Sequence, residues 1–236
     1  MTASGSSGAL PLRPLVRSFF ARPTLVVARD LIGCVLVHDS PEGRTVGTIV
    51  EAEAYGYDDP GSHANRGQTP RNAPMFEEPG HAYVYFTYGM HFCLNAVAHT
   101  PGVPGAVLLR AVEPLEGLDL MRQRRGAGIK DRDLARGPGR LTQSFGLHRD
   151  HNRLELTRKP LYICMGERYP EEAIIAGPRV GLGSTQDGRA WRYRVTGSPW
   201  TSTGPTGFSA AAQRSKGSSE PAKRPGDGAG RSPRRR

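Results

Sequence analysis

Two carboxylates in one apolar stretch of the sequence could perform acid–base chemistry. Glu51 and Glu53 lie two residues apart, and Tyr55 continues the same spacing. Because side chains alternate along a β-strand, these three residues would share one face, and the alanines between them would share the other. Burying a carboxylate is costly unless it is paired. Two interpretations therefore stay open: a polar, solvent-facing side of an edge strand, or a carboxylate held to orient or deprotonate a water molecule.

The polar segment from His63 to Asn72 lacks apolar periodicity and is expected to form a long loop. Ordered loops of this length often carry function. Arg66 and Arg71 could bind phosphates there, or they could be merely solvated on a surface loop. The residues able to fix the loop on itself by hydrogen bonds are Asn65, Gln68, Thr69 and Asn72. A single histidine such as His63 is more often structural, so its role depends on its neighbours.

Aromatic residues are concentrated in the segment 83–88, which contains three tyrosines and one phenylalanine although Phe, Trp and Tyr make up only 7% of the chain. We predict a β-hairpin here, with Gly89 supplying the positive φ of a tight turn. Tyr88 would then lie at the tip with little core to pack against, and it could act as a wedge in a base stack. An ordinary aromatic strand face is an equal alternative for Tyr85 and Tyr88, and it is the preferred interpretation for Tyr83.

Polar residues also interrupt the apolar segments that follow. Asn95 and Arg110 must find hydrogen-bond partners inside the fold, either as structural groups or as part of a site. Four potential metal ligands occur close together in the sequence: His63, His91, Cys93 and His99. None of their spacings is typical of zinc ligands. We therefore expect neither a metal site nor a cofactor.

Both helices and strands are needed to position these residues. The expected helices are 13–20, 24–31, 115–125 and 134–145. The expected strands are 34–37, 45–55, 83–88, 90–97 and 106–112, with late strand or turn elements at 180–183 and 191–195. Helices and strands do not alternate as βαβ units would. We therefore predict an α+β fold, a single domain with a curved antiparallel β-sheet core, surrounding helices and a protruding β-hairpin.

Composition divides the chain into three parts. A length of 236 residues suits one domain with a substantial core. We expect a flexible leader at 1–12, a folded domain at 13–202, and a disordered basic tail rich in Gly, Ser, Pro and Arg at 203–236. The net charge of +10 favours an anionic partner such as nucleic acid or an anionic membrane. Residues 204–236 contain eight Lys and Arg against two acids and thus supply +6 of that charge.

The sequence also bears on the compartment. The first residues lack the apolar segment of a signal peptide, and no apolar run approaches the ~20 residues of a transmembrane helix. Three cysteines without a Cys-x-x-Cys pair fit a reducing environment. We expect a cytoplasmic monomer, associated with the nucleoid if the source is prokaryotic.

Several uncommon motifs, in this order, resemble the alkyladenine (3-methyladenine) DNA glycosylase family of base-excision repair, over about 19–202. They are Glu-Ala-Glu-Ala-Tyr at 51–55, Gln-Thr-Pro-Arg-Asn at 68–72, Tyr-Val-Tyr-Phe-Thr-Tyr-Gly-Met at 83–90, Phe-Cys-Leu-Asn at 92–95 and Leu-Leu-Arg-Ala-Val-Glu-Pro-Leu-Glu-Gly at 108–117. The resemblance implies a DNA-inserting hairpin and an enzyme that flips alkylated or deaminated purines out of double-stranded DNA. It would hydrolyse the N-glycosidic bond without a cofactor and leave an abasic site.

The resemblance also implies roles for individual residues. Glu53 matches the carboxylate that activates the attacking water, and Arg110 matches the arginine that helps orient it. The residues that match the base pocket are Tyr55, His63, Tyr85 and Asn95. Those that match DNA-inserting positions are Tyr88 and Met75, and those assigned to the DNA backbone are Arg66 and Arg71. No lysine in these motifs is placed to form a Schiff base, so we expect a monofunctional glycosylase.

Two other classes of protein stay open on the sequence alone. A non-catalytic nucleic-acid-binding module, including one for RNA, would use the same aromatic residues for stacking but would not need Glu53. A protein bound to a membrane surface has only the basic tail in its favour. Release of a free base from a labelled duplex would separate the enzyme from the binding module.

Overall fold

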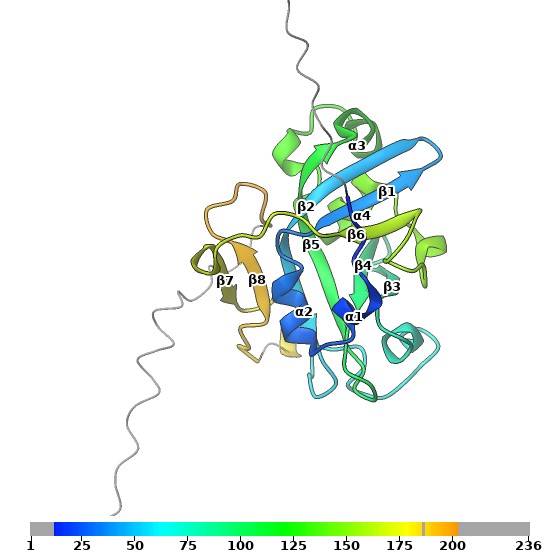
Figure 1. Cartoon of the computed structure of the whole chain (residues 1–236), viewed down its shortest axis with the longest axis vertical. Coiled ribbons are helices and arrows are strands. Elements are labelled where there is room, and N and C mark those ends of the chain that lie inside the picture. The colour runs from blue at the N-terminus through cyan, green and yellow to red at the C-terminus, as the bar shows by residue number, and fades with distance from the viewer. Residues whose placement is uncertain (1–11, 186, 203–236) are drawn as a thin grey trace, which may run out of the picture.

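An antiparallel sheet of eight strands organises the computed structural model, which describes residues 12–185 and 187–202 (Figure 1). The strands are β1 Val35–Ser40, β2 Gly43–Tyr55, β3 Ala82–Thr87, β4 His91–Val97, β5 Ala106–Glu116, β6 Leu161–Cys164, β7 Ile174–Gly177 and β8 Arg192–Val195. Their order is β3-β4-β5-β2-β1-β6, and β8 joins β7 to β2. The predicted α+β fold with an antiparallel sheet is confirmed.

Short helices complete the fold. The α-helices are α1 Arg17–Phe20, α2 Thr24–Asp30, α3 Leu118–Arg125 and α4 Pro138–Phe145. The 3-10 helices are η1 Ala73–Phe76, η2 Asp131–Asp133, η3 Arg149–His151, η4 Glu171–Ala173 and η5 Gly183–Thr185. Apolar residues of α2 and α4, such as Val27 and Phe145, share the main hydrophobic core with the sheet. Within the described residues, no helix combines the length and hydropathy that crossing a bilayer requires.

Three helices begin later than expected, each for a local reason. Leu15 donates its backbone N–H to the Ile163 carbonyl at 2.8 Å, so the chain before α1 runs beside β6. Strand β5 extends further than expected, and Gly117, with a φ of 80°, then directs the chain into α3. Helix α4 begins at Pro138, because the fixed φ and missing N–H of proline suit a first helical position.

Strand β2 is the element that positions the acidic residues. It pairs with β1 along its first half, with β8 along its second half, and with β5 along both. Ala52 and Ala54 lie in the main core, whereas Glu51 and Glu53 are fully buried elsewhere. The edge-strand interpretation is therefore wrong, because β2 has a neighbour on each side and both carboxylates are inside the protein.

A bulge between β2 and β5 places a cation beside these carboxylates. Glu51 pairs with Ala111, whereas the next residue, Ala52, pairs with Leu109. Arg110 is thus the extra residue of β5 at this point. Bulges bend a strand locally and re-aim a side chain, which is why they occur beside active sites.

The aromatic segment forms a hairpin from β3 and β4, in which residues 82–87 pair with 91–96. Both residues at the turn have positive φ, 51° for Tyr88 and 66° for Gly89. This combination matches the twist of two-residue hairpin turns, and for a residue other than glycine it costs on the order of 1 kcal/mol. Tyr88 thus adopts a strained backbone conformation, and this residue is 77% exposed.

Some expected boundaries differ from the structure. Strands β6 and β7 have four residues each, too few to produce a clear alternation in the sequence. The segment 180–183, expected as a strand or turn, is a turn element: it bends at 180–181 and leads into η5. Leu12 packs against a small apolar cluster beside β1 and so belongs to the fold. The rest of the expected leader, and the expected tail at 203–236, lie outside the described residues.

Two histidine rings join β1 to η3. His38 donates from Nδ1 to the Phe145 carbonyl at 2.7 Å, and its Nε2 lies 3.2 Å from Nε2 of His151. Burial, together with His38 and His148, lowers the pKa of His151 to about 4. Burial also lowers the pKa of His38. The folded protein therefore keeps His151 neutral well below the pH at which free histidine binds a proton, and the pKa of His38 is shifted in the same direction.

Acid should destabilise the fold through this pair. The unfolded chain protonates His151 near pH 6.5 and the folded chain only near pH 4, so stability is lost as the pH falls through this window. The loss expected from His151 by pH 4.5 is about 2 kcal/mol. Chemical denaturation at several pH values measures it. His151→Gln should decline less steeply than wild type between pH 6.5 and 4.5, and equal slopes would contradict this assignment.

Candidate active site

A cavity of about 410 Å³ brings together most of the residues singled out in the sequence. The predicted site residues that line it are Tyr55, His63, Met75, Tyr85, Tyr88, Asn95 and Arg110. They come from β2, the loop after it, η1, the β3–β4 hairpin and β5. Glu53 does not line this cavity itself but lies directly behind it, hydrogen-bonded to Tyr55 and Arg110. Residues far apart in the sequence thus meet at one face of β2.

Three donors hold the Glu53 carboxylate. The Tyr55 hydroxyl donates to Oε2 at 2.8 Å, and Arg110 donates from Nη1 to the same oxygen at 3.2 Å. The backbone N–H of Val180 donates to Oε1 at 2.8 Å. A carboxylate offers about four acceptor positions, so the donors from the described residues leave room for one more, such as a water molecule. The Val180 donor was missed from the sequence because it comes from an irregular segment far from β2.

Glu51 forms a second buried centre next to the first. Its Oε1 accepts hydrogen bonds from Arg110 Nε at 2.9 Å, Arg192 Nε at 2.7 Å and the Ser202 hydroxyl at 2.8 Å. The backbone N–H of Ser202 donates to the other oxygen. Arg110 therefore bridges both carboxylates, and Glu51 fixes the orientation of that bridge. No separate role for Glu51 was predicted from the sequence.

The charges in this cluster compensate one another. Burial alone would lower the pKa of Arg110, but the Glu53 and Glu51 carboxylates outweigh burial and raise it. Two guanidinium groups, of Arg110 and Arg192, thus face two carboxylates with almost no solvent contact. Such clusters hold geometry well, but losing one member leaves a buried charge without a partner.

Aromatic rings and one histidine surround the cavity. Burial and the neighbouring Glu53 carboxylate raise the pKa of Tyr55 well above its usual value, and burial raises that of Tyr85. Partial burial and Arg71 lower the pKa of His63. The His63 ring lies 4.7 Å from the Tyr85 ring, centroid to centroid. At neutral pH these walls are therefore uncharged and present flat π faces, which suit a planar ring system.

Asn95 lies in β4 opposite Tyr83 and lines the cavity. Its Nδ2 donates to the Tyr83 carbonyl at 3.0 Å. The strand thereby satisfies one side of the amide and holds the residue in place. Asn95 is consequently both a hydrogen-bonded structural group and part of the cavity surface, so the two interpretations of this residue are compatible.

The loop before η1 is fixed largely by Asn72. Its Nδ2 donates to the carbonyl oxygens of His63 at 2.6 Å and Gly67 at 2.9 Å. Its Oδ1 accepts from the backbone N–H of Thr69 at 2.6 Å. Both Asn72 and Thr69 were expected to fix the loop on itself. This network positions the backbone of His63 at the cavity.

The two loop arginines differ. Arg66 is exposed. Arg71 is also exposed, but it donates to the Phe86 carbonyl at 3.4 Å and its guanidinium lies 5.5 Å from the centre of the Tyr85 ring. Arg71 is therefore attached to the hairpin next to the cavity, whereas Arg66 points into solvent nearby.

Met75 departs from the expectation that it would enter DNA together with Tyr88. Its side chain is only 2% exposed and packs in a small core with Ala64, Tyr83 and Val97. A buried side chain cannot insert between bases without leaving this core. Met75 is therefore a packing residue of the cavity wall in this structure, and Tyr88 alone of the pair is exposed.

The potential metal ligands of the sequence do not converge. His99, for example, bonds through Nδ1 to the Thr100 carbonyl and through Nε2 to that of Glu77, both at 2.8 Å. In the part of the chain that the structure describes, no three His, Cys, Asp or Glu side chains are grouped as metal ligands.

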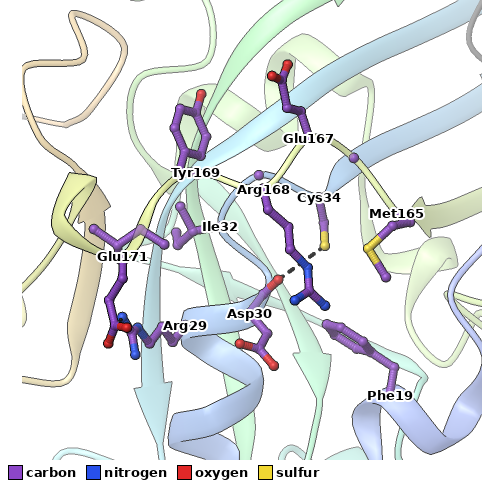
Figure 2. Close-up of a pocket in the computed structure, with 13 residues that line it drawn as sticks. Phe19, Arg29, Asp30, Ile32, Cys34, Met165, Glu167, Arg168, Tyr169 and Glu171 are labelled. Atoms are coloured by element: carbon purple, nitrogen blue, oxygen red, sulfur yellow. Dashed lines mark hydrogen bonds and ion pairs between the residues drawn. The ribbon is translucent and has the colours of Figure 1, made fainter.

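A smaller cavity of about 140 Å³ lies elsewhere, between α2 and the chain that follows β6 (Figure 2). Cys34 lines it and donates its thiol to the Asp30 carbonyl at 3.3 Å. Burial raises the pKa of Cys34 to about 12, so the thiol stays protonated and is a poor nucleophile. Figure 2 shows Arg168 passing beside this thiol. None of the predicted site residues borders this cavity.

Comparisons with protein families and with individual known proteins identify the same class of enzyme. The model of the methylpurine-DNA glycosylase family matches residues 18–199. A 3-methyladenine DNA glycosylase of Carboxydothermus hydrogenoformans, so described, is 47% identical over 174 residues, which cover 73% of this chain and 91% of that protein. A protein of the same description from Salinibacter ruber is 43% identical, covering 81% of this chain and 97% of its own length. One from Rhodopseudomonas palustris is 47% identical, with coverages of 82% and 94%.

Proposed function

Since the chain belongs to the methylpurine-DNA glycosylase family and is thus a DNA glycosylase of base repair, a hydrolase of N-glycosyl bonds, we propose that its substrates are damaged purines in double-stranded DNA. These are alkylated or deaminated purines of the 3-methyladenine class, and the product is an intact abasic site. One observation carries the proposal: the Glu53 carboxylate lies behind a cavity walled by tyrosine rings and hydrogen-bonds to one of them.

Base flipping explains why the enzyme needs this cavity. The sugar carbon C1′ cannot be reached inside a stacked duplex, so the nucleotide must be extruded at a cost of a few kcal/mol, least for a damaged base. Stacking on aromatic side chains returns roughly 1–3 kcal/mol per base. Tyr55 and Tyr85 provide such faces, and His63 lies against Tyr85. Asn95 lines the cavity and would restrict which substituents a bound purine can carry on the edge of its ring that faces this residue.

The hydrolytic step follows from the donors around Glu53. As the C1′–N bond breaks, positive charge develops on the sugar and the electron pair leaves with the base. Water forms the new bond to C1′ and gives a proton to Glu53, whose carboxylate also stabilises the developing charge. Arg110 holds the carboxylate at 3.2 Å and borders the cavity, where it helps orient the water.

The enzyme would bind DNA as a monomer and would accompany the nucleoid in a prokaryotic cell. Arg66 and Arg71 are exposed in the loop that follows His63, a residue of the cavity wall, and there their guanidinium groups would contact backbone phosphates. Phosphate contacts fix the register of a protein on DNA but carry no base preference. Recognition of the damaged base is therefore assigned to the cavity alone.

A labelled duplex with one hypoxanthine or one 3-methyladenine tests the proposal. We expect chromatography to detect the free base, while the strand breaks only after alkali treatment, since no lysine is assigned to cut it. Binding of the lesion duplex without release of either base would favour the non-catalytic binding module instead.

Tyr88→Ser should weaken binding to lesion-containing DNA by about tenfold, because the gap left by a flipped nucleotide would stay unfilled. Tyr88 is suited to fill it, as its side chain is 77% exposed at the mouth of the cavity. Fluorescence anisotropy with an abasic analogue measures the loss. Tyr57→Ser is the matched control, an exposed tyrosine outside this cavity, and should bind as wild type does. Equal affinities of all three proteins would argue against the wedge.

A further inference from the structure

Arg179 is a buried arginine for which the proposed mechanism has no use. Its side chain is 0% exposed, and it is among the largest fully buried side chains of the described residues. Burying a guanidinium requires both a counter-ion and hydrogen-bond acceptors. The arrangement around Arg179 therefore points to a specific task near the cavity.

Hydrogen bonds tie Arg179 to two segments that border the cavity. Its two terminal nitrogens bond both oxygens of Asp59, a residue in the loop between β2 and His63, and Nη2 lies 2.7 Å from Oδ1. Nη1 also donates to the carbonyl of Ala54 in β2 at 2.9 Å. Asp59 is itself 0% exposed. The ion pair thus fastens the loop to the end of β2.

Two aromatic rings enclose the same guanidinium. Its central carbon lies 4.7 Å from the centre of the Tyr55 ring and 5.1 Å from that of the Trp191 ring. Tyr55 lines the cavity, whereas Arg179 does not. Arg179 therefore covers the face of Tyr55 that is turned away from the cavity.

The neighbouring residue reinforces this link to the site. Val180, next in the chain, donates the backbone hydrogen bond to Glu53, and Tyr55 donates the phenolic one. One buried arginine thus borders both groups that hold the catalytic carboxylate. Moving its guanidinium would move the cavity wall and this donor together.

We propose that Arg179 is a specificity-determining positioning residue, which fixes the Tyr55 wall from behind and reduces its preference for cationic over neutral bases. The inference rests on the proposed function. A ring attracts a cation through the negative potential of its faces. With a guanidinium already on one face, the ring attracts a second cation less strongly on the other, while stacking with a neutral base is retained. Asp59 offsets part of this charge and so sets how strong the effect is.

The test compares two substrates within each protein. Hypoxanthine is neutral, whereas 3-methyladenine is cationic in DNA, and the ratio of their single-turnover rates cancels any general loss of activity. Replacing both ions together, as Arg179→Met with Asp59→Asn, leaves no unpaired buried charge. We expect the ratio of 3-methyladenine to hypoxanthine release to rise about fivefold in this double variant.

Asp59→Asn alone should have the opposite effect. The guanidinium then stays behind Tyr55 with less compensation, so the same ratio should fall about two- to fivefold. Asp187, which lies 3.8 Å from the Arg179 guanidinium, still provides a counter-ion in this variant. Asp59→Asn therefore tests the proposal independently if circular dichroism finds the double variant unfolded. Arg179→Lys keeps a cation in place, so it should lower both rates and leave the ratio near the wild-type value.

Arg22→Met is the matched control. Arg22 lies 4.4 Å from the Phe19 ring and pairs with Asp30, and none of these three residues borders the cavity. Its rates and their ratio should stay within about twofold of wild type. If wild type releases neither base, the proposed function fails. If wild type releases both and neither Asp59→Asn nor the double variant changes the ratio, the role of Arg179 fails and the function stands.

Discussion

Glu53→Gln is expected to lower the single-turnover rate of base release by about 10³-fold while lesion-containing duplex is still bound. The amide keeps the size of the carboxylate but can neither accept a proton from water nor balance positive charge on the sugar. Glu53 is fully buried and held by three donors, so the substitution changes a group whose position is fixed. Quench-flow measurement of free base gives the rate, and anisotropy gives the affinity.

Two further measurements separate chemistry from folding in this variant. A glutamine oxygen cannot satisfy every donor around position 53, so a stability loss of about 1–3 kcal/mol is expected as well. Thermal unfolding monitors that loss. Glu113→Gln serves as the control, because Glu113 lies on β5 outside the cavity and should leave the rate unchanged. Base release near the wild-type rate by Glu53→Gln would remove the carboxylate from the mechanism.

Local periodicity made the central part of the site predictable. The alternation along β2 requires only neighbouring residues, so the shared face of Glu51, Glu53 and Tyr55 follows from the sequence. The same applies to the hairpin turn, where Gly89 marks a positive φ. Such features depend on backbone geometry within a few residues, and the structure contains both.

Contacts between distant segments could not be predicted in this way. Val180 lies 127 positions after its partner Glu53, and Arg179 lies 120 positions after its partner Asp59, in a segment without periodicity. Met75 looked available for DNA, but packing around η1 buries it. A short apolar sequence does not reveal which of its residues will face a core that is assembled from other elements.

The bulge in β5 was likewise invisible in the sequence. In a regular ladder, strict alternation along β5 would determine the face on which Arg110 lies. The bulge interrupts that alternation, and Arg110 contacts both carboxylates of β2. The site thus depends on one irregular residue between two regular strands. It follows that Arg110 should matter for both stability and catalysis, and that the two effects should be separable.

Arg110→Met should be severely destabilising, by about 3–5 kcal/mol, because it leaves two buried carboxylates with fewer cations. Arg110 is 6% exposed and contacts Glu51 at 2.9 Å and Glu53 at 3.2 Å. Denaturant unfolding measures the loss. Arg153→Met is the control, since Arg153 pairs with Glu77 at the surface, where such pairs contribute little.

Adding Glu51→Gln to Arg110→Met distinguishes the two roles of the arginine. With both substitutions the cluster holds one carboxylate, Glu53, and one guanidinium, Arg192, so its net charge is balanced again; part of the lost stability should return, and the two substitutions should be strongly non-additive. Base release should not return, because Glu53 still lacks the guanidinium that holds its Oε2. Recovery of both stability and rate would mean that Arg110 acts only through the fold. Recovery of stability alone would place Arg110 in the reaction, with Glu51 as the residue that orients it.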